Sequence, residues 1–230
     1  MRIFALGDLH LSSASPKPMD IFGPAWKDHP QKITQNWRKK VSNEDWVLIC
    51  GDISWAMHLD EAQLDLNFIG SLPGKKILIK GNHDYWWKSI SKIRAALPKG
   101  MYSIQNDFIP IREIAICGTR GWQLPGGDIS TRDEKIYQRE LIRAEISLKK
   151  AHNEGFQKKL FMLHYPPFNN GKLDPGFQEL FRKYGVIWCV YGHLHGEDHH
   201  YAVEGVIDET EYKFVSCDFV NFTPVPITRL

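Results

Sequence analysis

Short apolar runs of four to six residues recur along the chain and are separated by more polar segments. Each run is rich in Ile, Val, Leu or aromatic residues and is bounded by Gly, Asp, Asn or Pro. This pattern is typical of strands that are buried on both faces of a sheet. The predicted strands are Ile3–Leu6, Trp46–Cys50, Lys76–Ile79, Ile114–Cys117, Leu160–Leu163 and Val186–Tyr191.

Helical spacing fills several of the segments between these strands. Apolar residues three and four positions apart predict amphipathic helices over 59–70, 86–97 and 177–184. The longest helix is expected to begin at Thr131, where Thr131 and Glu134 form a capping-box pattern, and to end near Gly155. Strands that alternate with helices indicate parallel strand pairs joined by right-handed crossovers, and therefore an α/β fold.

The pattern changes after Gly196. Two apolar runs, Tyr201–Ile207 and Tyr212–Cys217, flank a turn and predict an antiparallel hairpin that closes the chain. Two long connections, Ser12–Gln35 and Gly118–Ser130, are rich in Pro, Gly and polar residues, and long ordered loops are often functional. The sequence has no internal repeat and no linker, so we expect a single domain over residues 1–230.

Five of the predicted strands are followed at once by residues that bind metal ions. In an open parallel sheet the carboxyl ends of the strands share one edge, so these side chains are expected to form a cluster. Imidazole, carboxylate and amide oxygen suit Mn, Fe and Zn ions. The residues concerned are Asp8, His10, Asp52, Asn82, His164, His193 and His195.

Seven such residues exceed the three or four protein ligands that one ion normally takes. The number fits two divalent ions about 3.5–4 Å apart with one shared carboxylate. The alternative is a structural accident of buried Asp and His residues, but each unpaired buried carboxylate would need a partner of its own. The sequence therefore predicts a pair of metal ions at this edge of the sheet.

The composition is that of an ordinary globular protein, with 43% hydrophobic and 24% charged residues in a chain of 230. The net charge of +2, from 29 basic and 27 acidic residues, gives no general reason to expect nucleic acid or an anionic membrane as a partner. No apolar run approaches the roughly 20 residues of a membrane-spanning helix, and residues 3–6 are too few for a signal-peptide core. The four cysteines are far apart in apolar runs, so free thiols in a reducing cytoplasm are expected.

The residues at the strand ends also carry a family resemblance. The blocks Asp8-x-His10, Gly51-Asp52, Gly81-Asn82-His83-Asp84, His164 and Gly192-His193-x-His195 occur in order over most of the chain. Any one block is common in proteins, but the set of five resembles the calcineurin-like metallophosphoesterases. The resemblance implies a four-layer α/β/β/α sandwich of two mixed sheets, with a binuclear metal site between them.

The resemblance also implies a role for each residue. One ion would bind Asp8, His10, Asp52 and His195, and the second would bind Asp52, Asn82, His164 and His193. Asp52 would bridge the two ions. His83 would bind no metal; it would face the substrate and support departure of the leaving group.

The sequence departs from one branch of the family. Phosphoprotein phosphatases have a second Asp three residues after the bridging Asp, where it orients the catalytic histidine, and here that position is Trp55. Asp84, or another group of the same loop, is the candidate for the orienting role. The departure argues against a Ser/Thr protein phosphatase.

Two residues after another predicted strand have two interpretations. Arg120 would bind a phosphate oxygen and Trp122 would stack on a ring, or Arg120 would pair with a carboxylate and Trp122 would pack its own loop. Trp55, Trp86 and Trp87 flank the site loops and are expected to pack in the core or at the rim of the site. His199 and His200 are expected in a strand, without a ligand role.

The leading hypothesis is hydrolysis of a small phosphate mono- or diester by a cytoplasmic enzyme, with the oligomeric state left open. The first alternative is a nuclease that acts on DNA or RNA, which would need a basic groove, whereas the lysines are dispersed along the sequence. The second alternative is a metal-binding interaction module without turnover.

Overall fold

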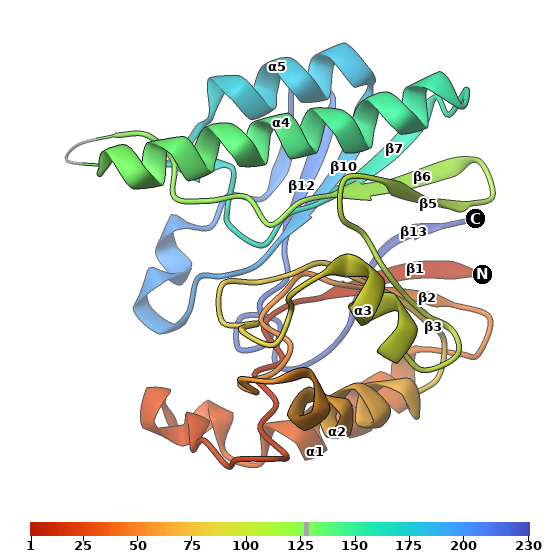
Figure 1. Ribbon diagram of the computed structural model, residues 1–230, viewed down its shortest axis with the longest axis vertical. Helices are drawn as coiled ribbons and strands as arrows, with labels where there is room; N and C mark the ends of the chain where they lie inside the picture. Colours follow the sequence, from red (N-terminus) through yellow and green to blue (C-terminus); the bar gives the residue numbers. More distant parts are fainter. Residues whose placement is uncertain (127–128) are drawn as a thin grey trace.

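The computed structural model describes residues 1–126 and 129–230 and contains two large mixed sheets (Figure 1). The first has the strand order β13-β1-β2-β3-β4, in which β1 to β4 are parallel and β13 is antiparallel to β1. Its strands are β1 (Arg2–Leu6), β2 (Trp46–Ile49), β3 (Lys75–Leu78), β4 (Met101–Ser103) and β13 (Val225–Arg229).

The second sheet has the order β11-β12-β10-β7-β6-β5, with a parallel centre and an antiparallel strand at each edge. Its strands are β5 (Phe108–Ile111), β6 (Ile114–Gly118), β7 (Lys158–Met162), β10 (Val186–Tyr191), β11 (Gly205–Ile207) and β12 (Thr210–Phe214). The strands β8 (Phe168–Asn169) and β9 (Lys172–Leu173) form a separate two-stranded hairpin.

Helices cover the outer faces of the two sheets (Figure 1). The first sheet is covered by α1 (His29–Lys40), α2 (Leu59–Gly70) and α3 (Ile90–Ala96). The second is covered by α4 (Thr131–Asn153) and α5 (Pro175–Tyr184). The four-layer α/β/β/α sandwich of two mixed sheets is thus confirmed.

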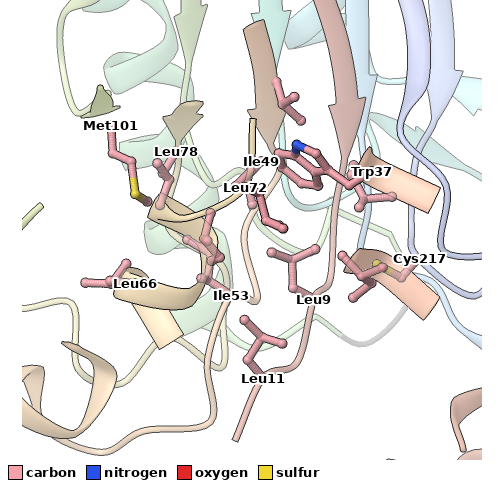
Figure 2. Close-up of a cluster of buried hydrophobic side chains, with 14 of the residues drawn as sticks. Leu9, Leu11, Trp37, Ile49, Ile53, Leu66, Leu72, Leu78, Met101 and Cys217 are labelled. Atoms are coloured by element: carbon pink, nitrogen blue, oxygen red, sulfur yellow. The ribbon is translucent and has the colours of Figure 1, made fainter. Parts of the chain in front are cut away.

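The alternation of side chains along the central strands explains the layering. On β1, Ile3 and Ala5 lie in an apolar cluster with residues of both sheets, whereas Phe4 and Leu6 lie in the cluster beneath α1 and α2. Figure 2 shows this second cluster, in which Trp37 of α1 lies near Ile49 of β2. Strands buried on both faces need apolar residues at every position, as the sequence pattern indicated.

One helix was not predicted. The connection Ser12–Gln35 contains two short 3-10 segments and the start of α1. The buried residues of α1 are His29, Ile33 and Trp37, and only the last two are apolar. Two apolar positions are too few to make a helical period easy to recognise in the sequence. Of the other long connection, residues 127 and 128 lie outside the described residues.

Other boundaries were wrong. The helix expected from residue 86 begins only at Ile90, because Trp86 and Trp87 are buried in a preceding turn. Tyr201 belongs to a 3-10 helix, Gly196–Tyr201, which also contains His199 and His200. The antiparallel hairpin exists as β11 and β12, but it does not close the chain, because β13 follows it and pairs in the other sheet.

The four cysteines are free and buried, as predicted. Within the described ranges, no helix combines the length and the apolar character that crossing a membrane requires.

Candidate metal centre

The backbone at the strand ends adopts conformations that L-residues rarely take. Asp8, His10, Asp52 and His193 have φ values of 58°, 45°, 48° and 81°. Such residues cost of order 1–3 kcal/mol each and persist only where the surroundings fix them. Here the loops after β1 and β2 fix each other, since the Asp8 N–H donates to the Gly51 carbonyl at 3.0 Å and the His10 N–H to the Asp52 carbonyl at 2.9 Å.

Two glycines let the carboxylates approach the backbone. A Cβ at Gly81 would lie 2.1 Å from Oδ1 of Asp52, and a Cβ at Gly192 would lie 2.2 Å from Oδ2 of Asp8. No side chain fits at either position, so both must be glycine for the two aspartates to point where they do.

A first group of ligand atoms lies where β1, β2 and β10 end. Nε2 of His10 and Nε2 of His195 are 3.2 Å apart. Oδ1 of Asp8 lies 3.8 Å from Nε2 of His195, and Oδ2 of Asp52 lies 3.7 Å from Nε2 of His10. These four residues are the set that the resemblance assigns to one ion.

A second group lies on the other side of Asp52. Oδ1 of Asn82 is 2.5 Å from Nε2 of His164 and 3.1 Å from Nδ1 of His193. Nδ1 of His193 and Nε2 of His164 are 3.2 Å apart, and Oδ1 of Asp52 lies 3.6 Å from Nε2 of His164. The two oxygens of Asp52 therefore face different groups, as a bridging carboxylate requires.

The second ring nitrogens of two histidines are already engaged. Nδ1 of His164 lies 3.0 Å from the carbonyl of Cys50, and because a carbonyl only accepts, this nitrogen carries the proton. Nδ1 of His195 lies 2.9 Å from Oδ1 of Asp218. Both arrangements leave Nε2 free for a metal, and such partners are usual behind metal-binding histidines.

Asp218 was missed by the sequence analysis, although the same rule could have found it. It follows the predicted strand Tyr212–Cys217 and so stands at a strand end, like the candidate ligands. Oδ2 of Asp218 also accepts from the Gly196 N–H at 3.1 Å and lies 3.1 Å from Nε2 of His199. His199 therefore lies behind the site rather than in it.

The protonation of these residues fits a metal site. Burial lowers the pKa of His164 to about 3 and of His193 to about 2, so both imidazoles are neutral, which is the form that binds metals. Burial raises the pKa of Asp8 to about 7 and also raises that of Asp52. In each ligand group, two imidazole nitrogens face each other at 3.2 Å beside buried carboxylates. Positive charge between them would stabilise this arrangement, and divalent ions provide such charge.

His83 lies at the open side of the site. Its side chain is 35% exposed, and its Nε2 is 4.0 Å from Oδ2 of Asp52. Its Nδ1 is hydrogen-bonded to the hydroxyl of Tyr85 at 3.2 Å, and its ring lies 4.4 Å from that of Trp55. Trp55 also stacks on His10, with ring centroids 5.0 Å apart, so it packs at the rim of the site and holds two of its histidines.

Asp84 does not reach the ring of His83. Its carboxylate is buried and accepts from the N–H groups of Ile53, Ser54 and Gly81, and from Nε1 of Trp86 at 3.0 Å. This candidate for orienting His83 thus connects the loops after β2 and β3, and the ring of His83 is contacted by Tyr85 and Trp55.

Arg120 and Trp122 lie together beside the centre. The Arg120 guanidinium is 4.3 Å from the centroid of the Trp122 ring and 3.6 Å from the buried carboxylate of Glu140. Nε1 of Trp122 donates to Asp133 at 3.0 Å. The carbonyl of Arg120 accepts from the N–H of His164 at 3.1 Å, so its backbone adjoins the second ligand group.

The sequence matches the family described as calcineurin-like phosphoesterase over residues 1–197, and the chain belongs to this family. A segment of 84 residues is 39% identical to the Gene 66 protein of Mycobacterium phage D29. The matched segment is 36% of this chain and 40% of the phage protein, so the chain spans well under half of that relative's length.

Solved structures share the fold at low sequence identity. The phosphopantetheinyl hydrolase (PptH) from Mycobacterium tuberculosis matches with a TM-score of 0.58 and 15% identity, over 100% of this chain and 96% of that one. A protein of unknown function, AQ665 from Aquifex aeolicus, matches with a TM-score of 0.54 and 16% identity, over 98% and 95%. At these identities the likeness concerns the fold.

Proposed function

We propose that this chain hydrolyses a small phosphate mono- or diester at a pair of divalent metal ions, drawn from Mn, Fe and Zn. The observation that carries the proposal is the position of Asp52, whose two oxygens face two separate groups of ligand atoms. Asp8, His10 and His195 complete one group, and three residues complete the other, namely Asn82, His164 and His193. Family membership supports the same class of reaction.

When bound, the ions would lower the pKa of water and offset negative charge on the phosphoryl oxygens. The chain's own residues fix the geometry in which this happens. The Asp84 carboxylate ties the loop after β2 to the loop after β3, and Asp218 and the Cys50 carbonyl hold the imidazoles of His195 and His164. A site held in this way needs little rearrangement when substrate arrives.

His83 is the residue placed to handle a proton. It is partly exposed beside Asp52, its Nδ1 is hydrogen-bonded to Tyr85, and its Nε2 points to the side of the site where Asp52 lies. A histidine in this position is expected to donate a proton to the leaving oxygen of the ester.

The direct test is an assay with Mn²⁺ on p-nitrophenyl phosphate and bis-p-nitrophenyl phosphate, with metal content measured on the same sample. The proposal is supported if either ester is hydrolysed, and if this activity is lost with a chelator and restored by Mn²⁺. The rates on the two esters then show whether monoesters or diesters are preferred. Two bound ions without hydrolysis of either ester would contradict it and favour an interaction module.

A further inference from the structure

A basic cavity lies beside the loops that follow β3 and β6. Its volume is ≈ 390 Å³, which is the size of a pocket for a small molecule. Of the described residues that line it, six are cationic and a single one, Glu140, is acidic. The cations are Lys80, Lys88, Arg120, Arg132, Arg139 and Arg143.

The positive charge of the cavity exceeds what its own partners neutralise. Glu140 is already engaged by Arg143 at 2.6 Å, by Arg120 at 3.6 Å and by the Thr119 hydroxyl. Lys80 donates to the carbonyl of Trp87 at 3.1 Å and so gains no opposite charge. A cavity with this surplus attracts an anion.

Two polar atoms of residues that line the cavity lack a hydrogen-bond partner. Over the described ranges, Nε of Arg120 and Oδ1 of Asn106 are buried without a hydrogen bond. Buried polar groups in native proteins are nearly always paired, and an exception calls for a ligand or water. Oδ1 of Asn106 is an acceptor and pairs only with a donor. The free N–H of Arg120 is a donor, and phosphate oxygens accept well from guanidinium groups.

A series of aromatic rings leads from the basic cavity to the metal centre. The Trp122 ring borders the basic cavity and also a second cavity of ≈ 420 Å³, which reaches His193. The centroid of the Tyr165 ring lies 5.2 Å from that of the Trp122 ring and 4.1 Å from that of the His193 ring. A molecule whose phosphate reacts at the metal centre could therefore lie across Tyr165 and Trp122 and extend into the basic cavity.

We propose that the basic cavity binds a second phosphate of the substrate. The substrate class is then a small molecule with two phosphate groups on a ring-sized spacer, one at the metal centre and the other among Arg120, Arg132 and Arg139. This assignment rests on the proposed function and makes Arg120 and Trp122 substrate-binding residues.

The test compares matched pairs of compounds with one and two phosphates. Phosphate release from adenosine 3′,5′-bisphosphate is compared with that from adenosine 5′-monophosphate, and fructose 1,6-bisphosphate with fructose 6-phosphate, on the Mn²⁺-loaded protein. We expect kcat/KM to be at least about tenfold higher for one bisphosphate than for its partner. The double variant Arg132→Gln/Arg139→Gln should abolish this preference by lowering kcat/KM for the bisphosphate to the level of its monophosphate partner.

The variant is chosen so that folding is preserved, because both arginines are exposed on α4. Lys149→Gln, an exposed cation on the same helix outside the cavity, is the matched control and should leave the preference intact. Equal kcat/KM values for both members of each pair would overturn the second phosphate site while leaving the proposed phosphoesterase in place.

Calorimetric titration separates the cavity from catalysis. If no compound is hydrolysed, the affinities of a bisphosphate for the double variant and for Lys149→Gln are compared. Binding at least tenfold weaker to the double variant still supports the cavity site, whereas equal affinities overturn it. A ten-nucleotide RNA or DNA that is cut with a higher kcat/KM than either bisphosphate, in a reaction that the double variant loses, would assign the cavity to a nuclease instead.

Discussion

The two sheets contribute different chemistry to the same site. The first sheet supplies both carboxylates and the amide, from Asp8, Asp52 and Asn82, with His10 as its one imidazole; the second sheet supplies imidazoles alone. Each ligand group nevertheless contains side chains from both sheets. Neither half of the molecule holds a complete site, so bound ions would join the halves across the apolar layer between them.

The backbone conformation at the strand ends also differs between the two sheets. Three of the four ligand residues after the strands of the first sheet have positive φ, against His193 alone after those of the second. The strained loops after β1 and β2 are tied together by backbone hydrogen bonds, and Asp84 ties the loop after β2 to the loop after β3. The histidines of the second sheet are held by Asp218 and by the carbonyl of Cys50, which follows β2. The first sheet thus stores conformational strain where the charge is needed.

The largest effect is expected where the two groups meet. Asp52→Asn keeps the shape of the side chain but removes the charge that both ligand groups share. Loss of a residue that only supports a metal ligand typically lowers activity about 10–100-fold, and the loss in Asp52→Asn should be larger. Both ions should be lost in metal analysis. His195→Ala, which touches one group, should retain an ion in the other; two ions retained in Asp52→Asn would refute the bridging role.

His83 belongs to neither ligand group and should separate turnover from metal binding. His83→Ala is expected to lower kcat by roughly 10²–10⁴ because proton donation to the leaving group is lost. Metal content should stay unchanged. His152→Ala, an exposed histidine on α4, is the control and should behave as the unaltered protein. Equal turnover in the two variants would remove His83 from the mechanism.

The support of the second sheet is tested at Asp218. Asp218→Asn weakens the hydrogen bond that fixes the His195 ring, and metal affinity should drop about 10–100-fold. Titration of the metal-free protein with Mn²⁺ measures this loss. Asp198→Asn, an exposed aspartate in the neighbouring 3-10 helix, is the matched control. An affinity equal to that of the control would show that His195 needs no such support.

The smallest effect concerns the opposite end of the first sheet, where an aspartate stabilises the fold. Burial alone would raise the pKa of Asp45, but hydrogen bonds from Arg2 and Ser42 outweigh it and lower the pKa from 3.8 to about 2. The resulting stability is present above pH 3.8 and is lost as pH falls through 2. Asp45→Asn should therefore lower the free energy of unfolding at pH 7 by about 1–2 kcal/mol, since the exposed Arg2 is screened by solvent.

Urea denaturation between pH 7 and pH 2 measures this contribution. The difference between the variant and the unaltered protein should shrink as the pH falls. Glu44→Gln, the exposed neighbour of Asp45, should show no such difference. A gap that persists unchanged at pH 2 would mean that packing, and not charge, stabilises the Asp45 side chain.

The central strands could be predicted because strands buried on both faces leave continuous apolar runs, as in Val47 to Ile49. The four-layer arrangement was implied by the family resemblance. Strand β13 left no such run, since it is a half-exposed edge strand that contains Pro226, and edge strands tolerate proline. The start of α3 was misplaced because Trp86 follows helical spacing, although its burial and its bond to Asp84 belong to a turn.

The rule that parallel strands share their carboxyl ends predicted the grouping of the candidate ligands only in part. The ligand candidates follow strands of both sheets rather than of one, since His164, His193 and His195 come after β7 and β10. The partners of His83 could not be predicted, since Trp55 and Tyr85 contact its ring through loop conformations that no spacing rule describes. The basic cavity was missed for a related reason. Its cations come from the segment around Lys80, from Arg120 and from α4, so they look dispersed along the sequence and gather only in three dimensions.

The connection between the first and last strands bears on how the protein matures during synthesis. Asp8 is synthesised 208 positions before Ser216, yet its carboxylate accepts from the Ser216 hydroxyl at 2.7 Å, and the Gly7 N–H donates to the Val215 carbonyl. Beyond that point β13 must still pair with β1 to complete the first sheet. The loop after β1 therefore gains these contacts only once residues 215–229 have been made, and we expect cation uptake to follow the synthesis of that segment rather than to precede it.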